Sequence, residues 1–216
     1  MRFKTKNKLL ITISFILNFY FLSAQIAEIN SIDSKFDKRE QEIKSQNKRA
    51  KKYLPLLSEL NKERISEYSI VLKTFYLKDS TKFANHQNEF INKIEKFEKG
   101  EKVDDVLKNQ IPEKTKYLDY RNGGIGGFRK EIAKFLIIEH LPYFYNFGGI
   151  PLHSELKFTI DKDGQIKNVS AIGENEDFNT LVKVALFKTS GNWIPSEING
   201  RKVNDNLRFP INFQVN

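Results

Sequence analysis

Residues 155–172 decide the fold of this chain, and they read ELKFTIDKDGQIKNVSAI. In the first six residues, apolar and polar side chains alternate, a period of two that is typical of a half-buried β-strand. The apolar positions are Leu156, Phe158 and Ile160. Residues 161–164 end in Gly164, which tolerates the positive φ of a tight turn. The alternation is less regular over 165–172, so we predict a β-hairpin whose second strand holds a bulge.

The sequence after this hairpin predicts a helix, a turn and a last strand. The helix spans 177–190 and carries one apolar stripe at the helical period, formed by Phe178, Leu181, Val182, Ala185 and Leu186. Trp193, the only tryptophan, precedes Ile194 and Pro195 and is expected to fill the gap between helix and sheet. Asn199-Gly200 predicts the turn. The final strand, 207–215, again alternates apolar and polar residues.

The predicted fold class is α+β: a small antiparallel sheet packed with helices on one face, preceded by a helical segment. We expect a helical charged region over 25–111, a linker over 112–124 and the sheet-containing domain over 125–216. The linker prediction depends on turn residues around Pro112 and on a run of glycines over 123–127, which suggests a flexible joint. A short helix is expected from Phe128 to Ile138, with Phe128, Ile132, Phe135 and Leu136 on one face.

The first 24 residues have the anatomy of a secretory signal peptide. Four basic residues precede an apolar stretch over 9–24, which is shorter than the roughly 20 residues that a comfortable membrane span needs. An uncleaved N-terminal anchor is the alternative. The whole chain has a net charge of +9 from 36 basic and 27 acidic residues. Without the leader, 32 basic residues remain against 27, so the charge is +5 and nucleic-acid binding is not expected.

Over the helical charged region the apolar residues recur at helical spacing, and we expect two or three helices. The sequence predicts a break near Pro55, a helix start at Ser80-Thr81 and a stop at Gly100. A coiled coil is the alternative, although polar residues such as Arg64 interrupt the heptads. We interpret the region as a helical packing unit or a solvated spacer.

The sequence lacks the residues that several kinds of chemistry require. The chain has no cysteine, which excludes disulfides, a cysteine-based zinc site and a thiol nucleophile. The turn at 161–164 resembles the start of a calcium loop, but Ser170 stands where the closing glutamate belongs. No two of His86, His140 and His153 have metal-ligand spacing, and we expect surface roles for them. We therefore expect no enzyme activity, metal, cofactor or small-molecule substrate.

The last strand carries the candidate site. Pro210 lies inside it and cannot donate a ladder hydrogen bond, so the strand belongs at a sheet edge or contains a bulge. An edge strand exposes unpaired N–H and C=O groups with which a visiting peptide can pair. The predicted partner-binding residues are Leu207, Arg208, Phe209, Ile211, Asn212, Phe213, Gln214 and Val215. The alternatives are that the chain covers this edge or that two copies pair as a homodimer.

These segments together resemble the C-terminal domain of TonB energy transducers, in the version common in Bacteroidetes-type bacteria. The resemblance covers residues 126–215 and includes the stretches 127–129, 156–164, 193–195, 199–203 and 209–213. It implies a periplasmic module in which a strand near the C-terminus pairs with a short segment of a TonB-dependent outer-membrane receptor, linked to transmembrane transport.

Two features depart from that family. The leader has no histidine to couple to a proton-driven motor, and residues 26–120 contain only Pro55 and Pro112, where transducers carry a proline-rich spacer. We therefore expect a periplasmic or secreted protein that binds an envelope protein by strand pairing. An inner-membrane-anchored transducer is one alternative, and an envelope structural or peptidoglycan-associated protein without an energy-transducing role is another.

Overall fold

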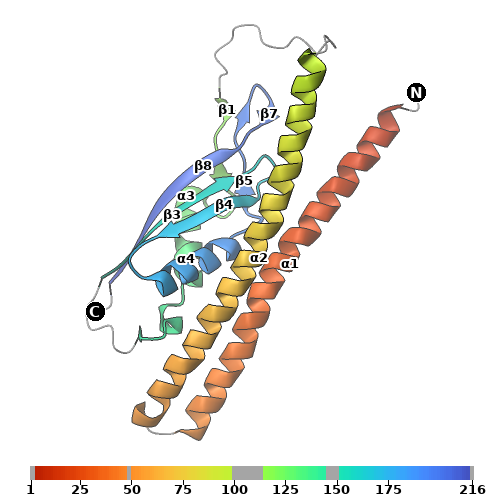
Figure 1. Cartoon of the computed structure of the whole chain (residues 1–216). Coiled ribbons are helices and arrows are strands. Elements are labelled where there is room, and N and C mark those ends of the chain that lie inside the picture. The colour runs from red at the N-terminus through yellow and green to blue at the C-terminus, as the bar shows by residue number, and fades with distance from the viewer. Residues whose placement is uncertain (1–2, 48–49, 99–113, 145–150, 215–216) are drawn as a thin grey trace.

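A three-stranded antiparallel sheet organises the C-terminal half of the computed structural model (Figure 1). The structure describes the backbone of residues 3–47, 50–98, 114–144 and 151–214, and the side chains of 24–47, 52–77, 116–144 and 151–214. The central strand β3 (Pro151–Ile160) pairs with β4 (Ile166–Ile172) on one side and with β8 (Asp205–Gln214) on the other. The α+β fold class is thus confirmed at this level.

The predicted hairpin is confirmed as β3 and β4. Gly164 has a φ of 77°, and its N–H donates to the carbonyl of Asp161 at 2.8 Å. The Asp161 carboxylate also accepts from the backbone N–H groups of Asp163 and Gln165, both at 2.9 Å, so the turn is closed from within. The predicted bulge is confirmed too, because the register shifts between Lys157 and Thr159 and Asn168 has a φ of 50°.

The inner face of the sheet is covered by two helices, α3 (Gly124–Phe135) and α4 (Glu176–Lys188). An aromatic cluster joins α3 to the sheet. Trp193 is buried, with ring centroids 4.7 Å from Phe128, 4.9 Å from Tyr120 and 5.7 Å from Phe158. The packing role that the sequence predicts for Trp193 is therefore confirmed, and edge-to-face contacts of this kind add to the energy of burial alone.

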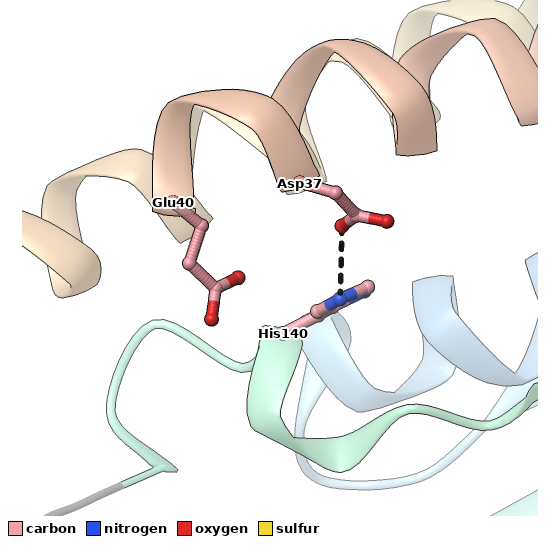
Figure 2. A group of neighbouring side chains, drawn as sticks. All are labelled: Asp37, Glu40 and His140. Atoms are coloured by element: carbon pink, nitrogen blue, oxygen red, sulfur yellow. Dashed lines mark ion pairs between the residues drawn. The ribbon is translucent and has the colours of Figure 1, made fainter. Parts of the chain in front are cut away.

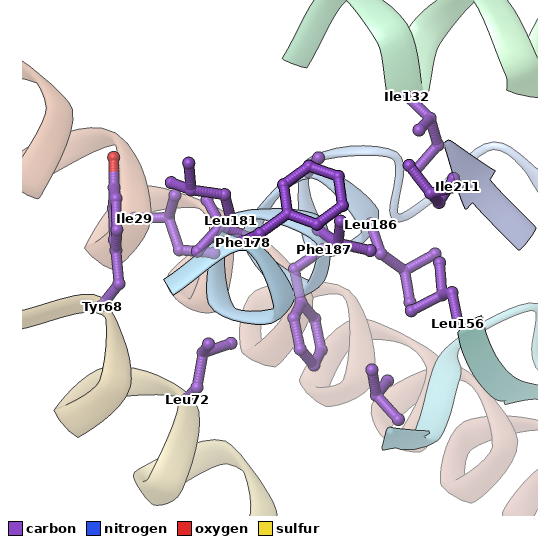
Figure 3. Close-up of a cluster of buried hydrophobic side chains, with 14 of the residues drawn as sticks. Ile29, Tyr68, Leu72, Ile132, Leu156, Phe178, Leu181, Leu186, Phe187 and Ile211 are labelled. Carbon is purple, nitrogen blue, oxygen red and sulfur yellow. The ribbon is translucent and has the colours of Figure 1, made fainter. Parts of the chain in front are cut away.

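Helix α4 is buried on two sides. Its predicted stripe is confirmed, and Asn175 caps its N-terminus by accepting from the Phe178 N–H at 2.8 Å. Val184 and Phe187, outside that stripe, are buried as well, and the Phe187 ring lies 5.2 Å from that of Phe75. Figure 3 shows α4 between core residues of the sheet and of the N-terminal helices. A helix that is apolar on more than one face requires cover on each.

That second cover is a hairpin of two long helices, α1 (Phe3–Gln46) and α2 (Ala50–Glu98). The helical character of this region is confirmed, but the breaks expected at Pro55 and at Ser80-Thr81 are wrong, since α2 continues through both. Pro55 is the sixth residue of α2, and its missing N–H removes one i→i−4 hydrogen bond without ending the helix. Gly100 lies outside the described residues. Within the described part of the chain, none of the helices has the length and apolarity to cross a membrane.

Part of the predicted linker is regular structure. Strand β1 (Lys114–Lys116) pairs with β6 (Glu197–Ile198), which pairs in turn with β7 (Arg201–Lys202) through the expected turn at Asn199-Gly200. Strand β2 (Asp119–Tyr120) pairs with β5 (Trp193–Ile194). These pairings attach residues 114–120 to the end of the domain. Their partners lie 73 to 84 residues away, so local sequence gives no sign of them.

The glycine run is also different from its prediction. Residues 124–127 form the first turn of α3 rather than a flexible joint, and α3 ends at Phe135, before a 3₁₀ turn, η1 (Ile138–His140). Gly127 packs so closely on the carbonyl oxygen of Asn122 that a Cβ there would overlap it. At Gly126 a Cβ would meet nothing within 4 Å. The close approach of the Asn122 backbone thus explains the glycine at position 127 but not the one at position 126.

Gly127→Ala and Gly126→Ala form a matched pair that tests this packing. We expect Gly127→Ala to destabilise the protein by more than about 1 kcal/mol, because the methyl group forces Asn122 away. Gly126→Ala should be neutral or stabilising by up to about 1 kcal/mol, because alanine favours helix. Urea unfolding of both variants measures the difference. Equal effects would contradict the close approach at Gly127.

Candidate functional site at the edge of strand β8

Strand β8 has a single strand neighbour in the described part of the chain. It pairs with β3 over ten consecutive positions, from Pro151↔Gln214 to Ile160↔Asp205, with no register shift. The other long side of β8 faces no strand in the sheet order β4-β3-β8. The edge position that Pro210 predicts is therefore confirmed.

Proline fixes which backbone groups of β8 point to this open side. Antiparallel pairs alternate between hydrogen-bonded and non-hydrogen-bonded positions. Pro210 has no N–H, so its pair with Glu155 must be of the non-hydrogen-bonded kind. Alternate residues share that geometry, which directs their backbone groups away from β3. The residues concerned are Asn206, Arg208, Pro210, Asn212 and Gln214, which offer five carbonyls and four N–H groups.

The opposite edge of the sheet is less suited to pairing. Strand β4 spans seven residues and contains the bulge at Asn168, whose left-handed backbone interrupts a straight row of donors and acceptors. Strand β8 spans ten residues without a bulge. Of the two edges, β8 is therefore the one that can accept a further strand.

A groove of about 220 Å³ runs beside β8 and is bounded by α3. Its lining residues are Arg129, Ile132, Ala133, Leu136, Phe209, Pro210, Ile211, Asn212 and Phe213. The ring of Phe209 lies 5.1 Å from that of Phe128, and the Arg129 guanidinium lies over it at 5.5 Å. The groove thus has an apolar floor and one cation at its rim. The free edge of β8 is flanked by α3, yet space remains between them.

Cross-strand pairs on the outer face hold β8 in register. His153 Nδ1 and Asn212 Oδ1 are 2.6 Å apart, and Thr159 donates to Asn206 at 2.8 Å. Arg208 forms an ion pair with Glu155. Lys157 Nζ, 2.8 Å away, and after it Arg208 lower the pKa of Glu155. These contacts use only side chains on the outer face of the sheet. The backbone groups of the same β8 residues still point away from β3, toward the open edge.

Of the predicted site residues, 207–209 and 211–214 all lie in β8, and Val215 lies outside the described residues. Leu207, Phe209, Ile211 and Phe213 point inward, toward the helices, and the alternate residues are exposed. The sequence prediction omitted Arg129 and Ala133 of α3, which complete the groove. The apolar face predicted for that helix includes Ile132 and Leu136. The sequence did not indicate that these side chains would lie beside β8.

A second group of polar residues lies where the helical hairpin meets the domain. Figure 2 shows Asp37 and Glu40 of α1 facing His140 of η1, and one ligand atom of each lies within 4.8 Å of the others. His140 is buried, so its predicted surface role is wrong. His153 is exposed as predicted, and the side chain of His86 lies outside the described residues.

Two carboxylates and an imidazole could hold a divalent metal ion. Here, however, the buried guanidinium of Arg64 stands among them. Its Nη2 atom lies 3.1 Å from Asp37 and 3.4 Å from Glu40, and its Nη1 atom donates to His140 Nε2. A metal ion would have to share this space with a fixed positive charge. We therefore interpret Arg64 as the cation of the cluster and the cluster as structural.

A scan of protein-family models and searches of curated proteins and of solved structures found no match to this chain. The candidate site is therefore defined by its geometry alone.

Arg64→Met and Arg39→Met compare two arginines that lie over the same ring, that of Phe36, at 5.6 and 5.3 Å. Arg64 is fully buried, so its loss removes the cation that His140, Asp37 and Glu40 share, and we expect a loss of about 3 kcal/mol in stability. Arg39 forms an exposed ion pair with Glu63, so its loss should cost at most about 0.5 kcal/mol. Urea unfolding at neutral pH measures both; similar losses would contradict the structural role of Arg64.

Proposed function

We propose that this chain is a binding protein of a bacterial cell envelope that recognises an extended segment of another envelope protein by β-strand addition to β8. The observation that supports this most directly is the ten-residue edge with outward backbone groups beside an apolar groove. In strand addition, backbone hydrogen bonds supply affinity and side-chain pockets supply selectivity. Both elements are present on one side of β8.

The number of free groups sets the scale of the interaction. A net hydrogen bond in water contributes about 1 kcal/mol, so the outward N–H and C=O groups of β8 support only weak binding by themselves. Burial of a guest side chain in the groove would add about 25 cal/mol for each Å² of apolar surface. We therefore expect the groove to discriminate between guests. The absent N–H of Pro210 interrupts the edge and limits indiscriminate pairing.

The partner that we propose is an envelope protein, and a TonB-dependent outer-membrane receptor is the form that the family resemblance suggests. The leader-like sequence over 1–24 supports export, and the resemblance over 126–215 supports a role linked to transmembrane transport. Coupling to a proton-driven motor is not part of the proposal, because the leader contains no histidine. Nucleic acids and small-molecule substrates are not proposed as ligands.

An envelope structural or peptidoglycan-associated role remains the rival, with the helical hairpin as its working part. Deleting the hairpin would not separate the two functions, because Phe75 and Leu72 belong to the same hydrophobic core as α4. A test has to change the edge of β8 and leave that core intact.

Asn212→Pro and Asn212→Thr make that test. Residue 212 has the same ladder geometry as Pro210, so proline there removes one outward N–H and leaves the pairing with β3 intact. Threonine removes the amide side chain but retains the N–H. We expect a photo-crosslinker at Gln214 to capture an envelope protein in cells, the proline variant to lose that capture, and the threonine variant to keep it.

Three results would decide against the proposal. The first is no capture from Gln214, and the second is equal capture by the proline and threonine variants. In the third, the captured protein is a second copy of this chain, which would assign the edge to a homodimer. Circular dichroism and urea unfolding of both variants verify that the fold is retained.

A further inference from the structure

The helical hairpin is attached to the domain by buried polar contacts as well as by apolar packing. Asn61 of α2 donates to the carbonyls of Glu139 and Leu141, at 2.8 and 3.3 Å, and so holds η1. Asp33 of α1 accepts from Tyr68 of α2 and pairs with Lys188 of α4. Polar groups that are buried or half-buried at such a junction select one arrangement, because each group needs its own partner.

His140 lies at the centre of this junction, and its neighbours carry both signs of charge. From α1 the carboxylates of Asp33, Asp37 and Glu40 face it, and the nearest Asp37 oxygen is 3.9 Å from Nε2. Arg64 of α2 and Lys188 of α4 are the cations. Lys44 and Glu139 line the same opening to solvent, which has a volume of about 340 Å³.

The imidazole has to be neutral for this arrangement to hold. An arginine can only donate, so the Nε2 atom of His140 must accept from Arg64 and cannot carry a proton. Protonation would turn the acceptor into a donor and bring a second cation against a guanidinium that is itself fully buried. Burial, followed by the charge of Arg64, lowers the pKa of His140 to about 3, and Asp33 opposes this shift.

We propose that His140 is an acid-sensitive latch that releases the helical hairpin from the domain when its imidazole is protonated. The opened state allows His140 its ordinary pKa of about 6.5, so it binds a proton that the docked state excludes. Above about pH 6.5 the latch is closed. As the pH falls from there toward 3, the ratio of docked to open molecules decreases about tenfold per pH unit.

A buried thiol at the junction can report the open state. The chain has no cysteine, so each introduced thiol is unique. Leu72→Cys places one on α2 at a position that is 2% exposed and lies on the α4 side of the helix (Figure 3), and Ser154→Cys places an isosteric one inside the sheet. Labelling rates relative to those of the unfolded chain at the same pH give the opening equilibrium at each position. Opening at Leu72→Cys alone reports undocking, and opening at both reports unfolding of the whole chain.

We expect the opening equilibrium at Leu72→Cys to rise about 30-fold between pH 7.5 and pH 5.0. Unfolding of the whole chain frees the same histidine, so opening at Ser154→Cys should follow the same pH trend, but it should stay well below that at Leu72→Cys at each pH. His140→Gln keeps an acceptor for Arg64 but does not titrate, so it should abolish the rise. His153→Gln, at an exposed histidine, should preserve it. No rise at Leu72→Cys, equal opening equilibria at the two thiols, or a rise that persists in His140→Gln would overturn the latch.

The protein without substitutions gives a second readout if His140→Gln does not fold. Long-range ¹H–¹⁵N spectra distinguish a neutral imidazole with a bare Nε2 from an imidazolium. We expect the His140 signals of docked molecules to remain those of the neutral form from pH 7.5 to pH 5.0. Titration with an ordinary histidine pKa would overturn the proposal. None of these measurements requires a bound partner, so they are independent of strand addition at β8.

Discussion

The pairing of β3 with β8 is the constraint on which the candidate site depends. Strand β3 is central, so its backbone groups are used on both sides, and β8 is left with one side free. Pro210 determines which residues face that side, because a proline can occupy only a non-hydrogen-bonded position of the ladder. The same alternation sends Phe209 and Ile211 toward α3 and thereby forms the floor of the groove. The register of β8 on β3 thus determines both the free backbone edge and the apolar groove.

Helix α4 connects this site to the rest of the chain. It contacts the sheet through one face and the α1–α2 hairpin through another, so the helical region and the domain share a hydrophobic core (Figure 3). Apolar packing gives such a junction its strength but little positional specificity. The contacts of Asn61 and Arg64 with η1 supply that specificity, at the cost of burying a charge. The hairpin is therefore an integral part of the structure and not a solvated spacer.

Features encoded by neighbouring residues could be predicted from the sequence. The alternation in Leu156, Phe158 and Ile160, the glycine of the β3–β4 turn and the stripe of α4 each depend on local backbone geometry, and each is confirmed. Pro210 even indicated the position of its strand in the sheet, because the missing N–H has the same consequence in any fold.

The features that sequence analysis missed depend on distant partners. The pairing of β1 with β6 joins residues 84 positions apart at Lys114↔Ile198, and the burial of His140 depends on Arg64, 76 positions away. The glycine run was misread because the close approach of Gly127 to Asn122 is a property of the folded turn and not of composition. For the same reason the groove could not be foreseen, since it requires α3 to lie beside a strand that is more than 70 residues later in the chain.

Amide hydrogen exchange in β8, followed residue by residue by NMR on the isolated protein, tests the central claim most directly. The N–H groups of Leu207, Phe209, Ile211 and Phe213 point toward β3 and bond to it, so they should be protected from exchange. Those of Arg208 and Asn212 should exchange many times faster, because they face an unoccupied edge. Equal protection of both sets would mean that β8 is already paired on its outer side, and the account of this edge as a binding site would be wrong.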